Sequence, residues 1–271
     1  MRRLDDTIDI DAFLSRFEAC GGTDEPYLRA HFARFVKTQQ RFLAERKRTS
    51  AAILDVGAHW LHQSLLYALR GFEVTALDTA ETFQDPHVKK LAEQYGITLL
   101  PEPDLAVPQA LGGVPSDSFD VVLFTEIIEH LTFNPVAMWK QIYRVMKPGA
   151  RLVVTTPNYY ALRGRAWRWS RFLSGAGAGL RVETLLSQPT FAHHWKEYSL
   201  TELRRYFSAL SPDFRFVRAE HVEKYGPSQR SHLVDGCARL IERCAPVLRP
   251  ELYLELELST KNAGIVVEPR W

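Results

Sequence analysis

The stretch Asp55-Val-Gly57-Ala-His59-Trp-Leu61 follows the apolar run Ala51–Leu54, and it decides the fold class. A short apolar run that ends in an acidic residue and a glycine is typical of a buried parallel strand that turns sharply into a helix. Glycine suits such a turn because it adopts a positive φ without strain and lets a ligand approach the backbone. The stretch therefore predicts the first strand-to-helix turn of a nucleotide-binding α/β domain.

The rest of the chain alternates between short apolar runs and helical patterns. We expect strands at residues 51–56, 73–77, 97–100, 119–124, 151–155, 214–219, 252–259 and 265–267. We expect helices at residues 64–69, 88–95, 136–146, 199–210 and 232–244. This alternation predicts a doubly wound α/β fold, in which helices cover both faces of a mostly parallel sheet. Ligands of such sheets bind at the carboxyl ends of the strands.

Two regions flank or interrupt this pattern. Residues 1–50 carry apolar side chains at steps of three and four, which predicts an N-terminal helical cap ahead of an α/β domain at residues 51–271. Residues 159–195 are basic, aromatic and glycine-rich, and they predict an inserted lid that contacts the substrate. The basic and aromatic residues of this insertion are Arg163, Arg165, Trp167, Arg168, Trp169, Arg171 and Phe172. They suit an anionic, ring-containing ligand, although an amphipathic helix with inward aromatic rings explains the same pattern.

Composition excludes several classes of protein. The 271 residues carry a formal net charge of +2, which is no electrostatic signature of nucleic-acid or membrane binding. No apolar run reaches the ~18 residues of a membrane span, and the N-terminus lacks the apolar core of a signal peptide. Three cysteines without paired spacing predict neither a disulfide framework nor a zinc cluster. We therefore expect a cytoplasmic protein.

Asp78 is the first candidate for ligand binding. It ends the second expected strand, one strand beyond the turn at Gly57. An acidic group at that place can accept the hydroxyl hydrogens of a ribose. Many α/β domains combine a glycine turn with a later acid, so this pair alone leaves the ligand open.

Two further stretches narrow the class. They are Phe119-Asp-Val-Val-Leu-Phe-Thr-Glu-Ile-Ile-Glu-His-Leu131 and Val145-Met-Lys-Pro-Gly-Ala-Arg-Leu-Val-Val-Thr-Thr-Pro-Asn158. In this order they resemble class I S-adenosylmethionine-dependent methyltransferases, and within them the branch of the ubiquinone-biosynthesis O-methyltransferases. The resemblance implies a Rossmann-like sheet of seven strands.

The same resemblance implies the cofactor residues. Asp55, Gly57 and Ala58 would face the methionine end of S-adenosylmethionine, and Asp78 would hold the ribose. The residues implied beside the adenine and the sulfonium are Asp104, Leu105, Thr125 and Glu126. The chain departs from the family at the second and third glycine positions, where it has His59 and Leu61. If the loop needs a positive φ there, each side chain is disfavoured by ~1 kcal/mol or more.

Glu126-x-x-Glu129-His130 is the second candidate site. We expect it to open a helix, so that the three side chains share one face and offer hard oxygen and nitrogen ligands to Mg²⁺ or Mn²⁺. The motif resembles that of metal-dependent members of the branch, which implies His194, rather than His193, as a further ligand. Without metal, His130, His193 or His194 would act as general base, with Glu129 beside them.

We therefore expect transfer of a methyl group to a hydroxyl of a small acceptor, sugar-containing or anionic, with or without a divalent cation. A dinucleotide-dependent oxidoreductase needs Gly-x-Gly-x-x-Gly, which the turn at Gly57 lacks. An RNA 2′-O-methyltransferase and a non-catalytic methyltransferase-like scaffold stay open. The first fits the metal motif and the basic insertion, and the second fits His59 and Leu61.

Overall fold

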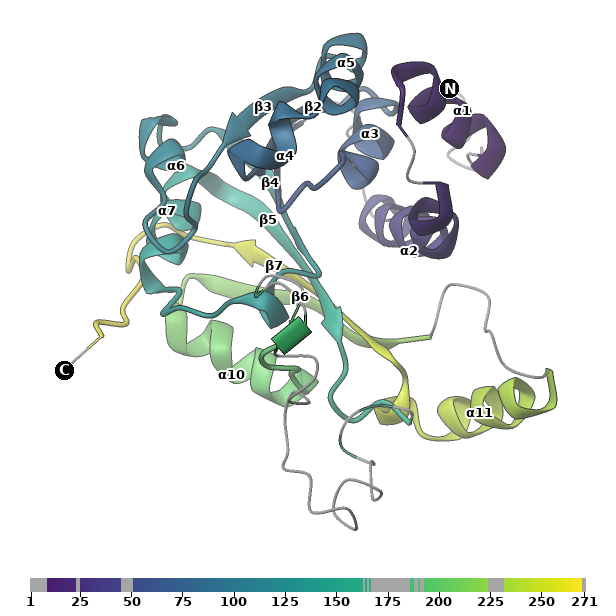
Figure 1. Ribbon diagram of the computed structural model, residues 1–271. Helices are drawn as coiled ribbons and strands as arrows, with labels where there is room; N and C mark the ends of the chain where they lie inside the picture. The colour runs from purple at the N-terminus through teal and green to yellow at the C-terminus, as the bar shows by residue number, and fades with distance from the viewer. Residues whose placement is uncertain are drawn as a thin grey trace. The chain divides into compact units, whose positions relative to one another are not determined.

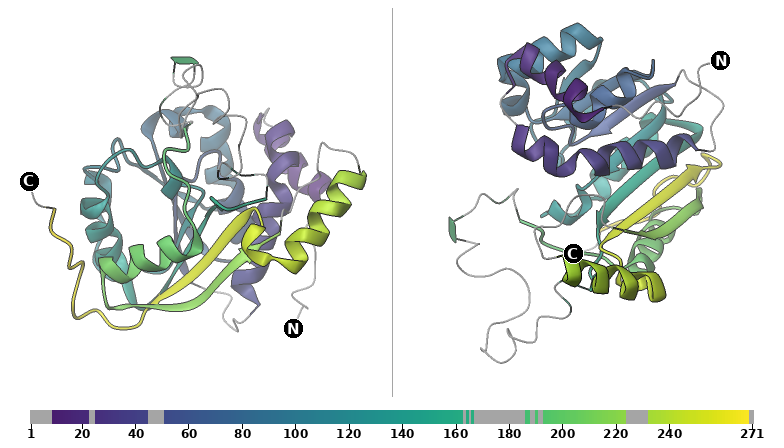
Figure 2. Two further views of the ribbon diagram at one scale, coloured as in Figure 1. Left: turned by 90° about the horizontal axis from the view of Figure 1, so that it is seen from below. Right: turned by 90° about the vertical axis from the view of Figure 1, so that its right-hand side faces the viewer.

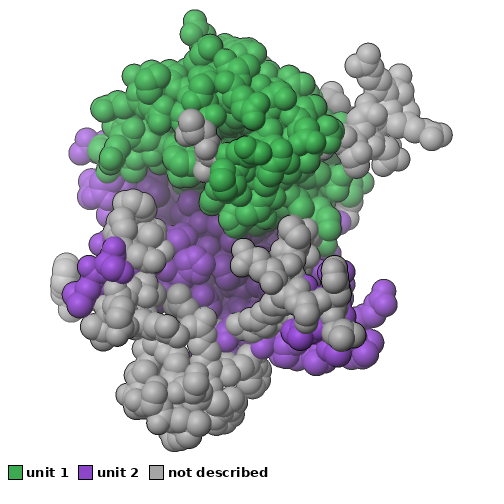
Figure 3. Space-filling view, turned by 45° about the vertical axis from the view of Figure 1, so that its right-hand side comes forward, with its two compact units in different colours: residues 1–103, 225–227 green, residues 104–224, 228–271 purple. Residues whose placement is uncertain are grey.

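The structure is a computed structural model that describes residues 9–22, 25–44, 51–162, 164, 166, 186–187, 190, 193–223 and 232–269. The chain divides into two compact units, which Figure 3 distinguishes by colour. The first unit comprises Met1–Pro103 and Tyr225–Pro227, and the second comprises Asp104–Lys224 and Ser228–Trp271.

The described residues form a seven-stranded sheet in the order β3-β2-β1-β4-β5-β7-β6 (Figure 1). The strands are β1 (Ala52–Val56), β2 (Glu73–Asp78), β3 (Thr98–Pro101), β4 (Phe119–Thr125), β5 (Met146–Pro157), β6 (Phe214–Val222) and β7 (Glu251–Leu258). The pairs β1–β2, β2–β3 and β4–β5 are parallel, whereas β7 is antiparallel to both β5 and β6. The predicted fold class, with its mostly parallel sheet, is confirmed.

Helices follow most of the strands. They are α1 (Ile10–Cys20), α2 (Glu25–Leu43), α3 (His62–Ala68), α4 (Ala80–Gln84), α5 (Pro86–Tyr95), α6 (Gln109–Gly113), α7 (Val136–Val145), α10 (Leu200–Leu210) and α11 (His232–Cys244). Two 3-10 turns, η1 (Ile128–His130) and η4 (Pro246–Leu248), join them. The expected strand at 265–267 is wrong. That segment lies against the end of α10, where Val266 N–H donates to the carbonyl of Leu210 at 2.9 Å.

In the first unit, α1 and α2 pack on the helices that flank the β3-β2-β1 part of the sheet (Figures 1 and 2). Helix α1 contacts α5, and α2 contacts α3. The ring of Phe13 lies 5.2 Å from that of Phe17 and 5.1 Å from that of Phe32. Asp9 caps the start of α1, and Gly21 ends it in the left-handed conformation that glycine adopts without strain.

In the second unit, one aromatic side chain of α7 contacts both β4 and α10. The indole of Trp139 is fully buried and lies 4.9 Å from the ring of Phe124 and 5.3 Å from that of Phe207. A capping box between Ser199 and Glu202 fixes the start of α10. This core supports the strands whose carboxyl ends carry the second candidate site.

Some sequence-based expectations are not tested. The basic and aromatic residues predicted for the lid, between Arg163 and Phe172, all lie outside the described residues. Of residues 163–172, the structure describes only Gly164 and Ala166. The lid and the domain boundary after residue 50 stay predictions. Among the described residues, no helix combines the length and apolarity that crossing a membrane requires.

Candidate functional site

The loop after β1 is tied to the end of β2. The backbone N–H groups of Gly57 and Ala58 donate to the carbonyl of Leu77 at 2.8 and 3.1 Å, and Leu61 N–H donates to the carbonyl of Ala58 at 2.8 Å. The loop then enters α3, whose first residue is His62. The turn predicted from the opening stretch is therefore present and held from both sides.

The same loop adopts the left-handed backbone conformation at three alternate positions. The φ angle is +72° at Gly57, +48° at His59 and +67° at Leu61. His59 and Leu61 thus adopt the conformation that favours glycine, and each costs roughly 1 to 2 kcal/mol relative to a glycine at the same position. Packing offsets this strain at Leu61, whose side chain is fully buried. The strain that the sequence made conditional on a positive φ is thus a property of the fold.

Asp78 lies beside this loop. Its Oδ2 accepts the backbone N–H of His59 at 2.7 Å. Its Oδ1 accepts the backbone N–H of Thr79 at 2.7 Å and the hydroxyl of Thr82 at 3.1 Å. The half-buried carboxylate is therefore oriented by three donors next to the glycine turn. Neither His59 nor Thr82 could be recognised as its partner from the sequence.

Asp55 is enclosed rather than open to solvent. Its side chain is buried, and Ser64 of α3 donates a hydrogen bond to it at 2.6 Å. Burial raises the pKa of Asp55 to about 7, assisted by the charge of Asp78 and opposed by the Ser64 hydrogen bond. A carboxyl group in this state links the end of β1 to α3, and Ser64 is a partner that the sequence did not reveal.

The imidazole of His59 belongs to a group of rings. Its centroid lies 4.3 Å from the ring of Trp60 and 5.8 Å from the ring of Tyr27 on α2. Desolvation lowers the pKa of His59, the charge of Asp78 opposes that effect and His87 adds to it. His59 is therefore predominantly neutral at pH 7.

Four predicted cofactor residues lie in the second unit, namely Asp104, Leu105, Thr125 and Glu126. Asp104 is exposed, and its Oδ1 accepts the backbone N–H of Ala106 at 2.8 Å. Leu105 is half-buried in the same turn, and half-buried Thr125 ends β4. Their assignment to the adenine and the sulfonium stays a prediction.

The motif from Glu126 to His130 does not form the expected helical face. Glu126 follows β4 with a φ of +57°, and Glu129 and His130 lie in the 3-10 turn η1. The next α-helix, α7, begins only at Val136. The prediction that Glu126, Glu129 and His130 share one face of a helix is therefore wrong, because the left-handed residue separates Glu126 from the turn.

A compact group nevertheless forms with a residue more than sixty positions away. One ligand atom each from Glu129, His130 and His194 lies within 4.8 Å of the others, and Glu126 is not part of this group. The backbone explains the approach of His194, because the N–H groups of Trp195 and Lys196 donate to the carbonyl of Glu129 at 2.7 and 3.3 Å.

The surroundings of the two imidazoles orient them. Nδ1 of His130 lies 3.1 Å from the carbonyl of His193, which only accepts hydrogen bonds, so the Nδ1 of a neutral His130 carries the proton. Its Nε2 therefore presents a lone pair, 3.9 Å from Oε1 of Glu129. Nδ1 of His194 lies 3.4 Å from Oε1 of Glu197. A carbonyl or carboxylate beside one ring nitrogen is typical of histidines whose other nitrogen binds a metal or accepts a proton.

Glu129 is the buried member of the group, with 1% of its surface exposed. Its Oε2 accepts the hydroxyl of Thr156 at 2.9 Å, and no hydrogen bond to its Oε1 is found within the described part of the chain. Burial raises the pKa of Glu129 well above its ordinary value, and the charge of Glu126 adds to this effect. Thr156 lies in the quoted Thr-Thr-Pro-Asn stretch, but its partner could not be read from it.

Two bacterial enzymes are similar in sequence to part of this chain. A ubiquinone biosynthesis O-methyltransferase of Xanthomonas oryzae pv. oryzae is 33% identical over 110 residues, which are 40% of this chain and 44% of that protein. The enzyme of the same name from Paramagnetospirillum magneticum is 28% identical over 173 residues, which are 64% of this chain and 62% of that protein. Each match thus spans less than two thirds of the relative.

A crystal structure of a SAM dependent methyltransferase from Archaeoglobus fulgidus has the same fold. Its TM-score is 0.50 at 18% identity, over 90% of this chain and 99% of that chain. A family model described as a methyltransferase domain matches residues 27–210, more than half of the sequence. The resemblance inferred from the motifs is confirmed, and the chain belongs to the methyltransferase-domain family.

Proposed function

We propose that this chain transfers the methyl group of S-adenosylmethionine to a hydroxyl oxygen of a small acceptor, assisted by a divalent cation. The observation that carries the proposal is the group formed by Glu129, His130 and His194 at the carboxyl end of β4. The names of the two bacterial relatives support oxygen as the methylated atom. The proposed cation favours an acceptor whose oxygens can chelate it.

The first unit fits the methyl donor. S-adenosylmethionine has no phosphate, so its site needs an acceptor for the ribose rather than a cradle of N–H groups for an anion. Asp78 supplies an oriented carboxylate for that purpose. The left-handed loop at residues 57–61 turns the backbone as a glycine loop does. We assign the methionine end of the methyl donor to the vicinity of Asp55, Gly57 and Ala58 in this unit.

The second unit fits a divalent cation. A buried carboxylate oxygen of Glu129 that receives no hydrogen bond is a costly feature unless a cation approaches it. Glu129, His130 and His194 supply one carboxylate and two imidazoles, with Glu126 close enough to affect the pKa of Glu129. Two imidazoles favour Mn²⁺ over Mg²⁺, because Mg²⁺ prefers a shell of oxygens.

A bound cation would lower the pKa of a hydroxyl that coordinates it. An acceptor with two neighbouring hydroxyls is favoured, because both oxygens can chelate one ion, and a sugar diol and a catechol meet this condition. Transfer forms the oxygen–carbon bond as the carbon–sulfur bond breaks, and the hydroxyl proton must leave. In the absence of metal, Nε2 of His130 is the atom that can accept this proton, since the His193 carbonyl holds Nδ1.

The proposal is tested by methyl transfer from radiolabelled S-adenosylmethionine to two matched probes. These are 3,4-dihydroxybenzoate, which has neighbouring hydroxyls, and 4-hydroxybenzoate, which has one. We expect transfer to the first probe at least tenfold above the second, and loss of this preference when Mn²⁺ is removed. His194→Ala should abolish the metal dependence, whereas His221→Ala, a half-buried histidine on β6, should not.

Other outcomes separate the alternatives. Transfer could be equal for both probes, independent of metal and abolished by His130→Ala. That result would indicate a general base at His130 in place of a cation. Transfer only to RNA termini would replace the small acceptor. Failure of S-adenosylhomocysteine to bind would leave a methyltransferase-like scaffold.

A further inference from the structure

We propose that His59 and Asp78 divide the ribose of the methyl donor between them, so that Asp78 accepts one hydroxyl hydrogen and the imidazole of His59 accepts the other. The inference rests on the proposed use of S-adenosylmethionine. It concerns a position at which this chain has replaced a family glycine, and it assigns that replacement a binding role.

The first step is the hydrogen-bonding capacity of Asp78. A carboxylate offers about four acceptor sites, two on each oxygen. On Oδ1, the backbone N–H of Thr79 and the hydroxyl of Thr82 occupy both sites, at 2.7 and 3.1 Å. On Oδ2, the backbone N–H of His59 occupies one, at 2.7 Å. The described residues therefore leave one site for a ribose that has two hydroxyl hydrogens to donate.

The hydroxyl of Thr82 lies 3.1 Å from Oδ1 of Asp78 and 3.1 Å from the hydroxyl of Thr79. When Thr79 donates to Thr82, the hydrogen of Thr82 is directed to Asp78, because the carboxylate can only accept. A ligand hydroxyl would have to displace Thr82 in order to reach Oδ1.

The second step is the position of His59. Its backbone N–H contacts the one oxygen of Asp78 that retains capacity, so its side chain starts next to the remaining acceptor site. The side chain is exposed, and the ring packs on Trp60 at 4.3 Å between centroids. His59 has a φ of +48°, a conformation that favours glycine. Its side chain therefore occupies a space that a glycine would leave open.

The third step is the protonation state of the imidazole. A neutral imidazole has one acceptor nitrogen, whereas an imidazolium has none. Desolvation lowers the pKa of His59 despite the nearby charge of Asp78, so the acceptor form predominates at pH 7. His59 therefore has the capacity that Asp78 lacks.

The test combines variants with ligands that lack one hydroxyl. Calorimetric affinities are measured for S-adenosylhomocysteine and its 2′-deoxy and 3′-deoxy analogues. In the unmodified protein, each missing hydroxyl should weaken binding about five- to tenfold, the effect of one hydrogen bond. His59→Ala should be insensitive to the loss of one hydroxyl, and Asp78→Asn should lose most of its sensitivity to the other.

Three variants serve as controls. His59→Gly removes the imidazole and relieves the backbone, so agreement with His59→Ala shows that the contact, and not the strain, sets the pattern. His31→Ala removes a ring that packs on Tyr27 at 4.3 Å, and it should keep full sensitivity to both hydroxyls. Thr82→Val frees a site on Oδ1 of Asp78, so adding it to His59→Ala should restore sensitivity to the hydroxyl that His59→Ala had ignored.

The outcomes distinguish this inference from the function on which it rests. If S-adenosylhomocysteine does not bind the unmodified protein, the proposed function fails. If it binds and His59→Ala stays equally sensitive to both hydroxyls, the ribose is held by Asp78 alone and the inference is overturned. Tighter binding of every ligand by His59→Gly and His59→Ala would also overturn it, because His59 would then obstruct the site.

Discussion

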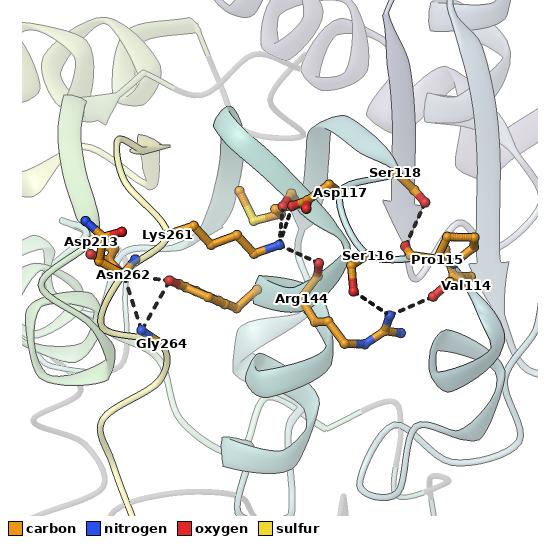
Figure 4. Close-up of polar contacts among 12 residues, drawn as sticks. Val114, Pro115, Ser116, Asp117, Ser118, Arg144, Asp213, Lys261, Asn262 and Gly264 are labelled. Carbon is orange, nitrogen blue, oxygen red and sulfur yellow. Dashed lines mark hydrogen bonds and ion pairs between the residues drawn. The ribbon is translucent and has the colours of Figure 1, made fainter.

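Asp213 and Glu129 are two buried carboxylates of the same unit with opposite surroundings. Asp213 precedes β6 and accepts hydrogen bonds from the hydroxyls of Tyr143 and Thr260 and from the backbone N–H groups of residues 262–264. Figure 4 shows Asp213 beside Asn262 and Gly264. Among the described residues, Thr156 is the one whose side chain donates a hydrogen bond to the Glu129 carboxylate. Both side chains are less than 5% exposed.

The pKa values of the two groups diverge accordingly. Burial acts to raise both. At Asp213 the donors, led by Tyr143 and Thr260, outweigh burial and lower the pKa to about 2. At Glu129 the single donor does not, and the pKa is raised well above its ordinary value. Asp213 is thus surrounded by donors that stabilise its anion, whereas one carboxylate oxygen of Glu129 receives no hydrogen bond from the described residues.

The neighbourhood of Asp213 supports this interpretation. Lys261 donates to a carboxylate oxygen of Asp117 and to the carbonyls of Arg144 and Met146, at 2.5, 2.6 and 2.9 Å (Figure 4). Arg144 in turn donates to the carbonyl of Val114 at 2.7 Å. These contacts fasten the segment after β7 to the starts of β4 and β5, away from the strand ends that carry Glu129.

The largest expected effect is that of Asp213→Ala on stability. Removing the carboxylate leaves two hydroxyls and three backbone N–H groups without this acceptor. The free energy of unfolding should therefore fall by about 3 kcal/mol or more. Urea denaturation measures the change. Asp120→Ala, which removes a surface pair with Lys147 at 2.8 Å, is the matched control and should cost less than about 1 kcal/mol. Similar losses in both variants would contradict the structural role of Asp213.

Acid should remove the contribution of Asp213. Because its folded pKa of about 2 lies below the ordinary value of 3.8, its contribution is present above pH 4 and is lost as the pH falls towards 2. We expect a loss of about 1 to 2 kcal/mol in this window. Comparing unfolding of the unmodified protein and Asp213→Asn at pH 5, 4 and 3 isolates the effect. A stability difference that stays constant over this range would refute the assignment.

Glu129→Gln should have the opposite consequence in metal-stripped protein. The amide can still accept from Thr156 but does not ionise, so stability should stay constant or rise by about 1 kcal/mol. Since the pKa of Glu129 is raised on folding, the gain should increase as the pH rises above 4.5, the ordinary pKa of the group. Thermal unfolding in the presence and absence of Mn²⁺ measures it. A loss above about 2 kcal/mol would show that the ionised carboxylate is structural, as at Asp213.

Thr156→Val should have the smallest effect. It keeps the shape of a fully buried side chain and removes the one hydroxyl among the described residues that donates to Glu129, at a cost of about 0.5 to 1 kcal/mol. Affinity for Mn²⁺ should fall by less than tenfold, since the two histidines are untouched. Calorimetric titration with Mn²⁺ provides the check, and complete loss of binding would mean that Thr156 itself holds the ion.

The sheet could be predicted because its signals are local. The run that ends at Asp55 and the acid at Asp78 lie at strand ends, and the alternation of apolar runs with helical patterns needs no knowledge of distant residues. The same holds for the left-handed loop, since Gly57 already marks a turn. The predicted strand at 265–267 failed because Val266 bonds to the end of a helix, which the pattern of apolar residues does not encode.

The group at the candidate site contains three of the four ligands predicted from the motif, Glu129, His130 and His194, but its geometry could not be predicted. The Glu-x-x-Glu-His spacing suggested a helix, yet the positive φ of Glu126 places it before a 3-10 turn. The approach of His194 depends on hydrogen bonds between its neighbours and the Glu129 carbonyl, and the partners Thr156 and Ser64 depend on contacts between elements. Such contacts follow from packing, and no sequence period reveals them.

Calorimetric titration of S-adenosylhomocysteine into the full chain tests the central claim, binding of the methyl donor, most directly. The account predicts saturable binding to one site, and a loss of at least tenfold in affinity for Asp78→Ala with unchanged secondary structure by circular dichroism. Absence of heat at millimolar ligand, with the protein folded, would contradict it and show that His59 and Leu61 have closed the site.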